Sequence, residues 1–408
     1  MYVLKGRIID GTGRDPIENG LVVVEGNKIT EVCKQNEFTI PDKAEIIEIK
    51  DGTIMPGFIE QHVHLGIGSV NPQIMFEYTI QERTCQAIYD LQKLIEAGFT
   101  SVREPGGFGY LLKEPIAKGL INGTRICSAD VITQTGGHFD MYQKYPTEWL
   151  KQRASGAGLI LADGKEEVRK ASRISLRNGS EFLKICTTGG ITSQGDINTN
   201  SQYSLEEIKT FVEEAEMHDT YVSSHAQGTA GIKNALLGGV KSIEHGIFMD
   251  DECIELMIEK GAWVVPTFTI CQVYMDFIKL VPKWIVPKIE ASYPAHYESI
   301  KKCYKAGIKI GLGADLLGDP RVCPYGINGR EFEKLTQIGM SPMEAIVAGT
   351  KTGAEIIMRE NELGTLEPGK LADITICEGN PLEKIKILAK VKKIKFVMID
   401  GKIKKHIE

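Results

Sequence analysis

Both ends of the chain carry short runs in which apolar and polar residues alternate. The segment LVVVEGNKITEV (21–32) has two β-rich halves around Gly26-Asn27, a pair typical of a tight hairpin turn. Near the other end, KFVMIDGKIKK (395–405) turns at Asp400-Gly401. Neither end is long enough to bury a core alone. The pattern therefore predicts a small β-sandwich domain built from residues 1–54 and 356–408.

Between the two ends, apolar runs alternate with helical stretches. A helix predicted at CQAIYDLQKLIEAGF (85–99) precedes the strand TSVREP (100–105). Another helix opens at Ser204, with Glu207 completing a capping box, and leads into the strand TYVSSHA. Similar units continue as far as the strand IKIGLGAD. Repeated helix–strand units predict a parallel sheet in an α/β fold, and eight of them would close into a (β/α)8 TIM barrel over residues 55–355.

The bulk properties narrow the class of protein. The 408 residues carry a net charge of -6, and lysine and arginine form no strong cluster outside the C-terminal strands, which disfavours a nucleic-acid partner. No apolar stretch reaches membrane-spanning length, and the first residues lack the apolar segment of a signal peptide. Nine cysteines are scattered singly, as expected for reduced thiols. We expect a cytoplasmic protein with no membrane partner.

Two histidines end an apolar run that reads as a buried strand, TIMPGFIEQHVHLG (53–66). Because side chains alternate along a strand, His62 and His64 point to one face and Val63 to the other. Two imidazoles on one face can share a cation. An H-x-H pair is common, however, and taken alone it is equally consistent with chance.

Other polar residues lie on further predicted barrel strands. His225 lies in YVSSHA, His245 in SIEHG, Asp315 ends IKIGLGAD, and Lys184 lies within EFLKICTTGG. Barrel enzymes carry their catalytic groups at the carboxyl ends of the strands, so these side chains should converge. One buried lysine is more often paired than functional, and one such aspartate more often caps a helix. Together with the histidine pair, these positions predict a functional site.

These motifs resemble, in order and spacing, the binuclear metal site of the amidohydrolase superfamily. The flanking segments AGFTSVREPGG, QTGGHFD and GTLEPGKLADITI resemble it too, so the likeness covers nearly the whole chain. It is closest to the imidazolonepropionase-related branch, which includes Xaa-Pro dipeptidase-like and carboxypeptidase-like enzymes.

The resemblance implies a set of metal ligands. His62 and His64 would bind a first divalent ion, His225 and His245 a second, and a carboxylated Lys184 would bridge them. Imidazole and carboxylate suit zinc, although iron, manganese or cobalt could occupy the same ligands. Two cations need a shared anion to offset their repulsion. A carbamate formed from carbon dioxide on Lys184 would supply it, since a buried lysine loses its proton readily.

The resemblance also implies catalytic roles. Asp315 would bind the first metal and carry a proton from the hydroxide shared by the metals to the leaving amine. His138 in TGGHFD would lie beside the substrate, the alternative being a surface-loop histidine. Three positions depart from the family: Glu60 and Glu104 replace aspartate, and Tyr325 stands where many relatives carry histidine. The two glutamates keep the charge outside the ligand set, whereas Tyr325 bears on specificity.

The activity implied is hydrolysis of a C–N amide bond in small molecules, namely dipeptides or N-acyl-L-amino acids. Arg321, Tyr325 and Arg330 follow Asp315 in one loop and are candidates for binding the free carboxylate of the substrate. A cyclic-amide hydrolase of the imidazolonepropionase type, or a deaminase, is the alternative, although those relatives mostly use one metal and lack the bridging lysine. A catalytically dead scaffold is less favoured because all six ligand positions are present. Whether the protein is a homo-oligomer stays open.

Overall fold

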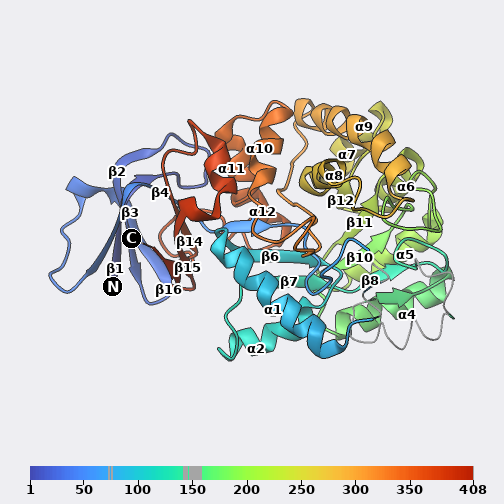
Figure 1. Ribbon diagram of the computed structural model, residues 1–408, viewed down its shortest axis with the longest axis horizontal. Coiled ribbons are helices and arrows are strands. Elements are labelled where there is room, and N and C mark those ends of the chain that lie inside the picture. The colour runs from blue at the N-terminus through green and yellow to red at the C-terminus, as the bar shows by residue number, and fades with distance from the viewer. Residues whose placement is uncertain (72–73, 75–76, 141–145, 147–158, 408) are drawn as a thin grey trace.

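The computed structural model describes residues 1–71, 74, 77–140, 146 and 159–407 and confirms the predicted α/β class. A β-sheet that contains both termini lies at one end of the molecule, and short parallel strands covered by helices form the rest (Figure 1). No helix among these residues is both long enough and apolar enough to cross a membrane.

The sheet at the termini, here called the terminal sheet, has seven strands in the order β16-β15-β14-β4-β1-β2-β3. Both predicted hairpins are present: β2 and β3 join through Gly26-Asn27, and β15 and β16 through Asp400-Gly401. Strand β4 pairs with β1 on one side and β14 on the other, so it holds the two ends of the chain together. The strands are β1 (Tyr2–Ile8), β2 (Ile17–Glu25), β3 (Lys28–Lys34), β4 (Glu45–Pro56), β14 (Ile374–Glu378), β15 (Ile394–Ile399) and β16 (Lys402–His406).

The remaining strands are all parallel to their neighbours, in the orders β5-β6-β7 and β13-β12-β11-β10-β8-β9. Strands β7 and β8 are separated by Asp130 alone. The strands are β5 (Phe58–Glu60), β6 (Phe99–Pro105), β7 (Arg125–Ala129), β8 (Val131–Thr133), β9 (Leu159–Leu161), β10 (Leu183–Cys186), β11 (Val222–Ala226), β12 (Ser242–His245) and β13 (Trp263–Val265).

The predicted strand at 308–315 is not a regular strand. It forms isolated parallel bridges instead, one from Ile310 to β13 and one from Leu316 to Val63. Backbone hydrogen bonds from Gly311 to Val264 (2.9 Å) and from Gln61 to Leu312 (2.8 Å) run on its two sides. The segment therefore connects β13 to the residues that follow β5.

The helices follow the strands in alternation, and the capping box predicted at Ser204 and Glu207 opens α5. The helices are α1 (Ile80–Glu96), α2 (Lys113–Ala117), α4 (Gly164–Arg177), α5 (Leu205–Glu216), α6 (Thr229–Gly238), α7 (Asp251–Lys260), α8 (Phe268–Asp276), α9 (Val286–Lys305), α10 (Arg330–Gln337), α11 (Pro342–Ala348) and α12 (Lys351–Ile356).

The apolar run before the histidine pair is two strands rather than the single strand predicted. Strand β4 ends at Pro56 in the terminal sheet, and β5 begins at Phe58 among the parallel strands. Gly57 separates them, and a Cβ there would lie 2.2 Å from the side chain of Thr100, so no larger residue fits. The chain thus passes from the terminal sheet directly to His62.

Candidate metal centre and active site

Side chains from several parallel strands meet beyond the strand ends. Nitrogen atoms of His62 and His245 and an oxygen of Asp315 all lie within 4.8 Å of one another, a spacing that could hold a metal ion. His64 Nε2 lies 3.4 Å from Asp315 Oδ1, and His225 Nδ1 lies 2.9 Å from His245 Nε2. Five of the six predicted ligands are therefore brought together by these distances.

Two of these residues have positive φ angles, which few residues other than glycine adopt. His245 has a φ of 71° and Asp315 a φ of 56°, both in the left-handed region. Thr267, whose hydroxyl lies 2.8 Å from His245 Nδ1, also has a positive φ, 60°. Such angles cost about 1–3 kcal/mol each and persist where the surrounding structure enforces them, commonly at functional sites.

His62 and His64 present bare nitrogens to each other. His62 Nδ1 lies 2.8 Å from a carboxylate oxygen of Glu244, and His64 Nδ1 contacts the carbonyl oxygen of Gly106. Both partners can only accept, so each ring carries a proton on Nδ1, and in the neutral form of the ring Nε2 has a lone pair. The two Nε2 atoms are 3.2 Å apart. A shared cation would remove this repulsion, and the outer hydrogen bonds are those typical of metal-binding histidines.

The second histidine pair repeats the arrangement. His225 Nε2 donates to the carbonyl of Gly189 at 3.0 Å, so its Nδ1 is bare and faces His245 Nε2. His245 Nδ1 has the Thr267 hydroxyl as a partner, which allows His245 to present a lone pair as well. Both pairs are thus prepared to bind cations.

Burial also favours the neutral form of the clustered histidines His62, His225 and His245. It lowers the pKa of His62 to about 4, and it lowers the pKa of His225 and His245 well below the ordinary value. Burial alone would raise the pKa of Asp315, but His62 and the neighbouring imidazoles hold that pKa below its usual range. At neutral pH His62, His225 and His245 are therefore neutral imidazoles and Asp315 is a carboxylate, the forms that bind metals.

Lys184 lies on β10 with 1% of its surface exposed. Among the residues that the structure describes, its Nζ has no hydrogen-bond partner. Burial lowers the pKa of Lys184, and the nearby carboxylate of Glu244 opposes the shift. The pKa values of His225 and His245 are lowered mainly by burial and further by the charge of Lys184. A buried amine without a hydrogen-bond partner is costly if it stays charged. A modified lysine that bridges two metals explains Lys184 better than a permanently charged ammonium in the core does.

A buried ion pair behind the cluster was not foreseen from the sequence. Arg103 Nη2 lies 2.7 Å from both carboxylate oxygens of Glu244, and the hydroxyls of Ser223 and Ser242 donate to the same group at 2.6 Å. This network fixes the carboxylate that orients His62. Both residues lie inside quoted motifs, VREP and SIEHG, but nothing in those motifs shows that they pair.

The two glutamates that replace aspartate brace the loops around the site. Glu60 accepts hydrogen bonds from the backbone of His62 (3.1 Å) and Ala314 (2.9 Å) and from Asn328 Nδ2 (2.8 Å). Burial raises the pKa of Glu60 to about 8. Glu104 likewise accepts hydrogen bonds from three backbone N–H groups of adjacent loops. Neither carboxylate is among the clustered ligand atoms.

His138 lies against the second histidine pair. Its ring stacks on His225 with centroids 3.9 Å apart and an interplanar angle of 21°. Its Nδ1 contacts the Ser193 hydroxyl and lies 4.0 Å from Asp196 Oδ2. Burial lowers the pKa of His138 well below the ordinary value. The position is that of a buried neutral histidine next to the cluster rather than a surface-loop residue.

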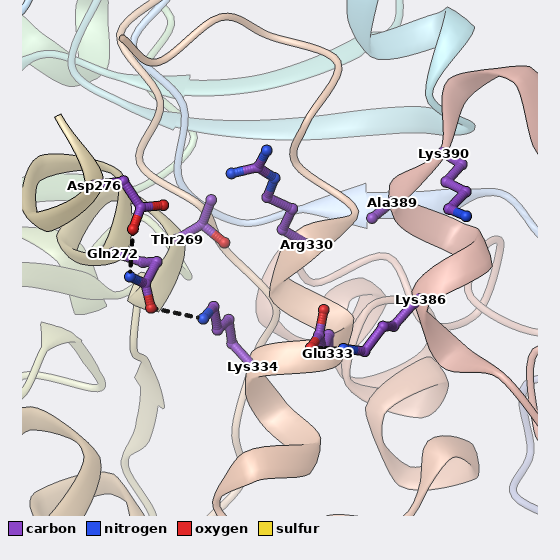
Figure 2. Close-up of a pocket in the computed structure, with 9 residues that line it drawn as sticks. All are labelled: Thr269, Gln272, Asp276, Arg330, Glu333, Lys334, Lys386, Ala389 and Lys390. Atoms are coloured by element: carbon purple, nitrogen blue, oxygen red, sulfur yellow. Dashed lines mark hydrogen bonds and ion pairs between the residues drawn. The ribbon is translucent and has the colours of Figure 1, made fainter.

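The three loop residues predicted to bind a carboxylate lie in different surroundings. Tyr325 is buried, and its hydroxyl accepts a hydrogen bond from the backbone of His64 at 3.0 Å. The Arg321 side chain is 73% exposed and pairs with Asp319. Arg330 lines a cavity of about 340 Å³ between α8, α10 and residues 386–390 (Figure 2). Their roles in substrate binding stay predictions.

Comparisons with known proteins identify the family of the chain. The model of the amidohydrolase family matches residues 53–404. Ochratoxinase from Aspergillus niger is 31% identical, over 98% of this chain and 86% of that protein. The crystal structure of a prolidase complexed with N-methylphosphonate-L-proline matches 100% of both chains, with a TM-score of 0.92 and 31% identity. Imidazolonepropionase from Symbiobacterium thermophilum is 23% identical over 88% of this chain and 84% of that protein. The chain therefore belongs to the amidohydrolase family.

Proposed function

We propose that the protein hydrolyses the amide bond of dipeptides or N-acyl-L-amino acids with two divalent metal ions, preferably zinc. The observation that carries the proposal is the close approach of ring nitrogens in two buried histidine pairs, His62 with His64 at 3.2 Å and His225 with His245 at 2.9 Å, together with a buried lysine amine that has no hydrogen-bond partner among the described residues. We assign the first metal to His62, His64 and Asp315 and the second to His225 and His245. A carbamate on Lys184 would bridge the two.

The side chains of the chain itself then have separate tasks. When bound, the ions would polarise the scissile carbonyl and acidify the attacking water. Asp315, held as a carboxylate, accepts the proton of that water and passes it to the leaving nitrogen. His138, neutral and stacked on His225, donates a hydrogen bond to the substrate carbonyl or carboxylate. Arg103 and Glu244 keep His62 oriented throughout.

The proposed substrate class rests on the relatives and on the chemistry of the loop after Asp315. A prolidase and an ochratoxinase resemble this chain at 31% identity, whereas the imidazolonepropionase resembles it at 23%. Arg321, Tyr325 and Arg330 offer donors for a free carboxylate on the leaving amino acid. The protein should therefore release the C-terminal residue of an L-configured substrate.

The architecture is part of the same proposal. Hydrogen bonds run from β5 through β6, β7/β8, β10, β11, β12 and β13 to segment 308–316 and back to residues 61–63. We interpret this ring as a (β/α)8 barrel over residues 55–355, with residues 1–54 and 356–408 forming a small β-sandwich domain. We also propose a cytoplasmic location.

A hydrolysis screen combined with metal analysis tests the proposal. We expect about two metal ions per chain and cleavage of N-acyl-L-amino acids or L,L-dipeptides, but little cleavage of the D-isomers or of substrates with an amidated carboxylate. Growth in ¹³C-bicarbonate should give a carbamate carbon signal that Lys184→Ala lacks. A single metal with an unmodified Lys184 would overturn the binuclear site. Cleavage of cyclic amides alone would overturn the substrate class.

A further inference from the structure

Helix α9 carries a stripe of polar side chains that faces the site. Lys288, Ser292 and His296 are spaced by four residues, so they lie on one side of the helix. His296 Nε2 donates to the carbonyl of His245 at 2.9 Å, and Ser292 accepts from Asn198 Nδ2 at 3.0 Å. The helix therefore contacts the loops that follow both β12 and β10.

Lys288 makes the closest of these contacts. Its Nζ donates to the backbone carbonyls of Gly190 (2.9 Å), Ser193 (2.7 Å) and Asp196 (2.6 Å). An ammonium has three N–H donors, so all three are used. Asp196 Oδ1 lies 3.5 Å away, and only 14% of the lysine side chain is exposed. Three carbonyl oxygens thus surround one ammonium group, in the way that carbonyl oxygens surround a bound cation. Their convergence on Lys288 holds residues 190–196 in a tight loop.

The same three residues also contact His138. A Cβ at Gly190 would lie 2.1 Å from Cε1 of the His138 ring, so the backbone there lies flat against the imidazole. The Ser193 hydroxyl contacts Nδ1, and the Asp196 carboxylate lies 4.0 Å from it. The three residues whose carbonyls bind Lys288 are therefore the same residues that contact His138.

We propose that Lys288 is a positioning residue that sets the orientation of His138 through the loop 190–196. Removing the ammonium leaves three carbonyl dipoles and a carboxylate without a cation, so the loop loses this restraint and holds the ring less firmly. Lys288 touches none of the clustered ligand atoms, so the metals stay bound. The kinetic effect expected from this role rests on the proposed function.

The test compares Lys288→Met, which keeps most of the stem but removes the charge, with His138→Ala and with both changes together. Lys288→Met should lower kcat/KM about 10- to 100-fold with unchanged metal content, because small misplacements of a catalytic group have effects of this size. In the double variant the losses should not add, since Lys288 acts through His138. Methylamine should partly rescue Lys288→Ala. Lys305→Met, exposed at the end of the same helix, is the control and should be neutral.

A second readout does not depend on the substrate. In protein with ¹⁵N-labelled histidine, Lys288→Met should shift the His138 ring signals, whereas Lys305→Met should not. Additive losses in the double variant, or unchanged His138 signals, would overturn the role of Lys288. If wild-type protein cleaves none of the amides offered, the proposed function fails, and the NMR comparison still decides the inference.

Discussion

The terminal sheet and the carboxyl ends of the parallel strands, here called the strand mouth, bury different kinds of side chain. In the terminal sheet the core consists of apolar side chains such as Leu4, Ile54 and Ile376, all fully buried. At the strand mouth the buried groups include imidazoles, a lysine and several carboxylates, and two of the proposed ligands, His245 and Asp315, have left-handed backbone angles.

The difference shows where the chain gives up stability for chemistry. Burying polar groups is costly unless each finds a partner, and left-handed angles at residues such as His245 add strain. The strand mouth accepts both costs, whereas the core of the terminal sheet is apolar and its non-glycine positive φ angles fall at Asn19, Asp51 and Asp400, residue types that tolerate them. Regions in which local rules fail are therefore the places to look for function.

The largest expected effect separates two aspartates that share an unusual backbone. Asp315 (φ 56°) lies in the cluster and Asp400 (φ 50°) in a hairpin turn. Asparagine tolerates this conformation at both positions. Asp315→Asn should lower kcat about 10²- to 10⁴-fold while most of the metal is retained, because an oxygen ligand survives and the base is lost. Asp400→Asn should leave kcat unchanged. Near wild-type turnover for Asp315→Asn would refute its role as the proton carrier.

Two arginines test the cost of the buried charges. Arg103 pairs with Glu244, and both side chains are fully buried. Arg103→Met should lower the free energy of unfolding by about 3–5 kcal/mol because it strands a buried carboxylate. Arg125 pairs with Asp373 and with the partly exposed Asp400, so Arg125→Met should cost less. Urea unfolding measures both. Equal losses would show that breaking the partly exposed ion pairs of Arg125 costs as much as breaking the fully buried pair of Arg103.

Two isoleucines separate packing from catalysis. Ile376 on β14 and Ile185 on β10 are both fully buried. Truncation of either to alanine should cost about 2–5 kcal/mol of unfolding free energy. Ile376→Ala should leave metal content and kcat unchanged, whereas Ile185→Ala should reduce both because it adjoins Lys184. A catalytic defect in Ile376→Ala would mean that the terminal sheet shapes the site.

The smallest effect is a pH dependence. Glu331 accepts hydrogen bonds from the backbone of Phe268 and Thr269, and burial raises its pKa from 4.5 to about 7. Between these values the folded chain holds a proton that the unfolded chain releases, so wild-type stability falls as pH rises through this window. Relative to Glu331→Gln, the slope should be more negative by about 1 kcal/mol per pH unit. Glu378→Gln is the control, since Lys393 holds the Glu378 pKa below its usual value. Identical slopes for wild type and Glu331→Gln would refute the shift.

Several parts of the fold and of the candidate site could be predicted because short stretches of sequence determine them. Hairpin turns at Gly26-Asn27 and Asp400-Gly401 follow from residues that accept positive φ. The capping box at Ser204 places the start of α5. The predicted alternation places His62 and His64 on one side, and their nitrogens lie 3.2 Å apart, although β5 itself ends at Glu60.

The rest depends on contacts between residues distant in sequence. Arg103 and Glu244 find each other across different strands, and no local pattern encodes that pairing. The loop that holds His138 needs a lysine from α9. The break at Gly57 was missed because the apolar run continues through it, although the two halves belong to different sheets.

The passage from β4 into β5 bears on how the protein is made. Strand β4 lies between β1 and β14, and β14 is near the end of the chain. During synthesis, β4 therefore has one edge unpaired until the residues of β14 have left the ribosome. His62 and His64 follow β4 by only a few residues, so their final placement waits as well. A nascent chain should acquire activity only after β14 has emerged, and a truncation that removes β14 should yield a protein that neither retains metal nor turns over substrate.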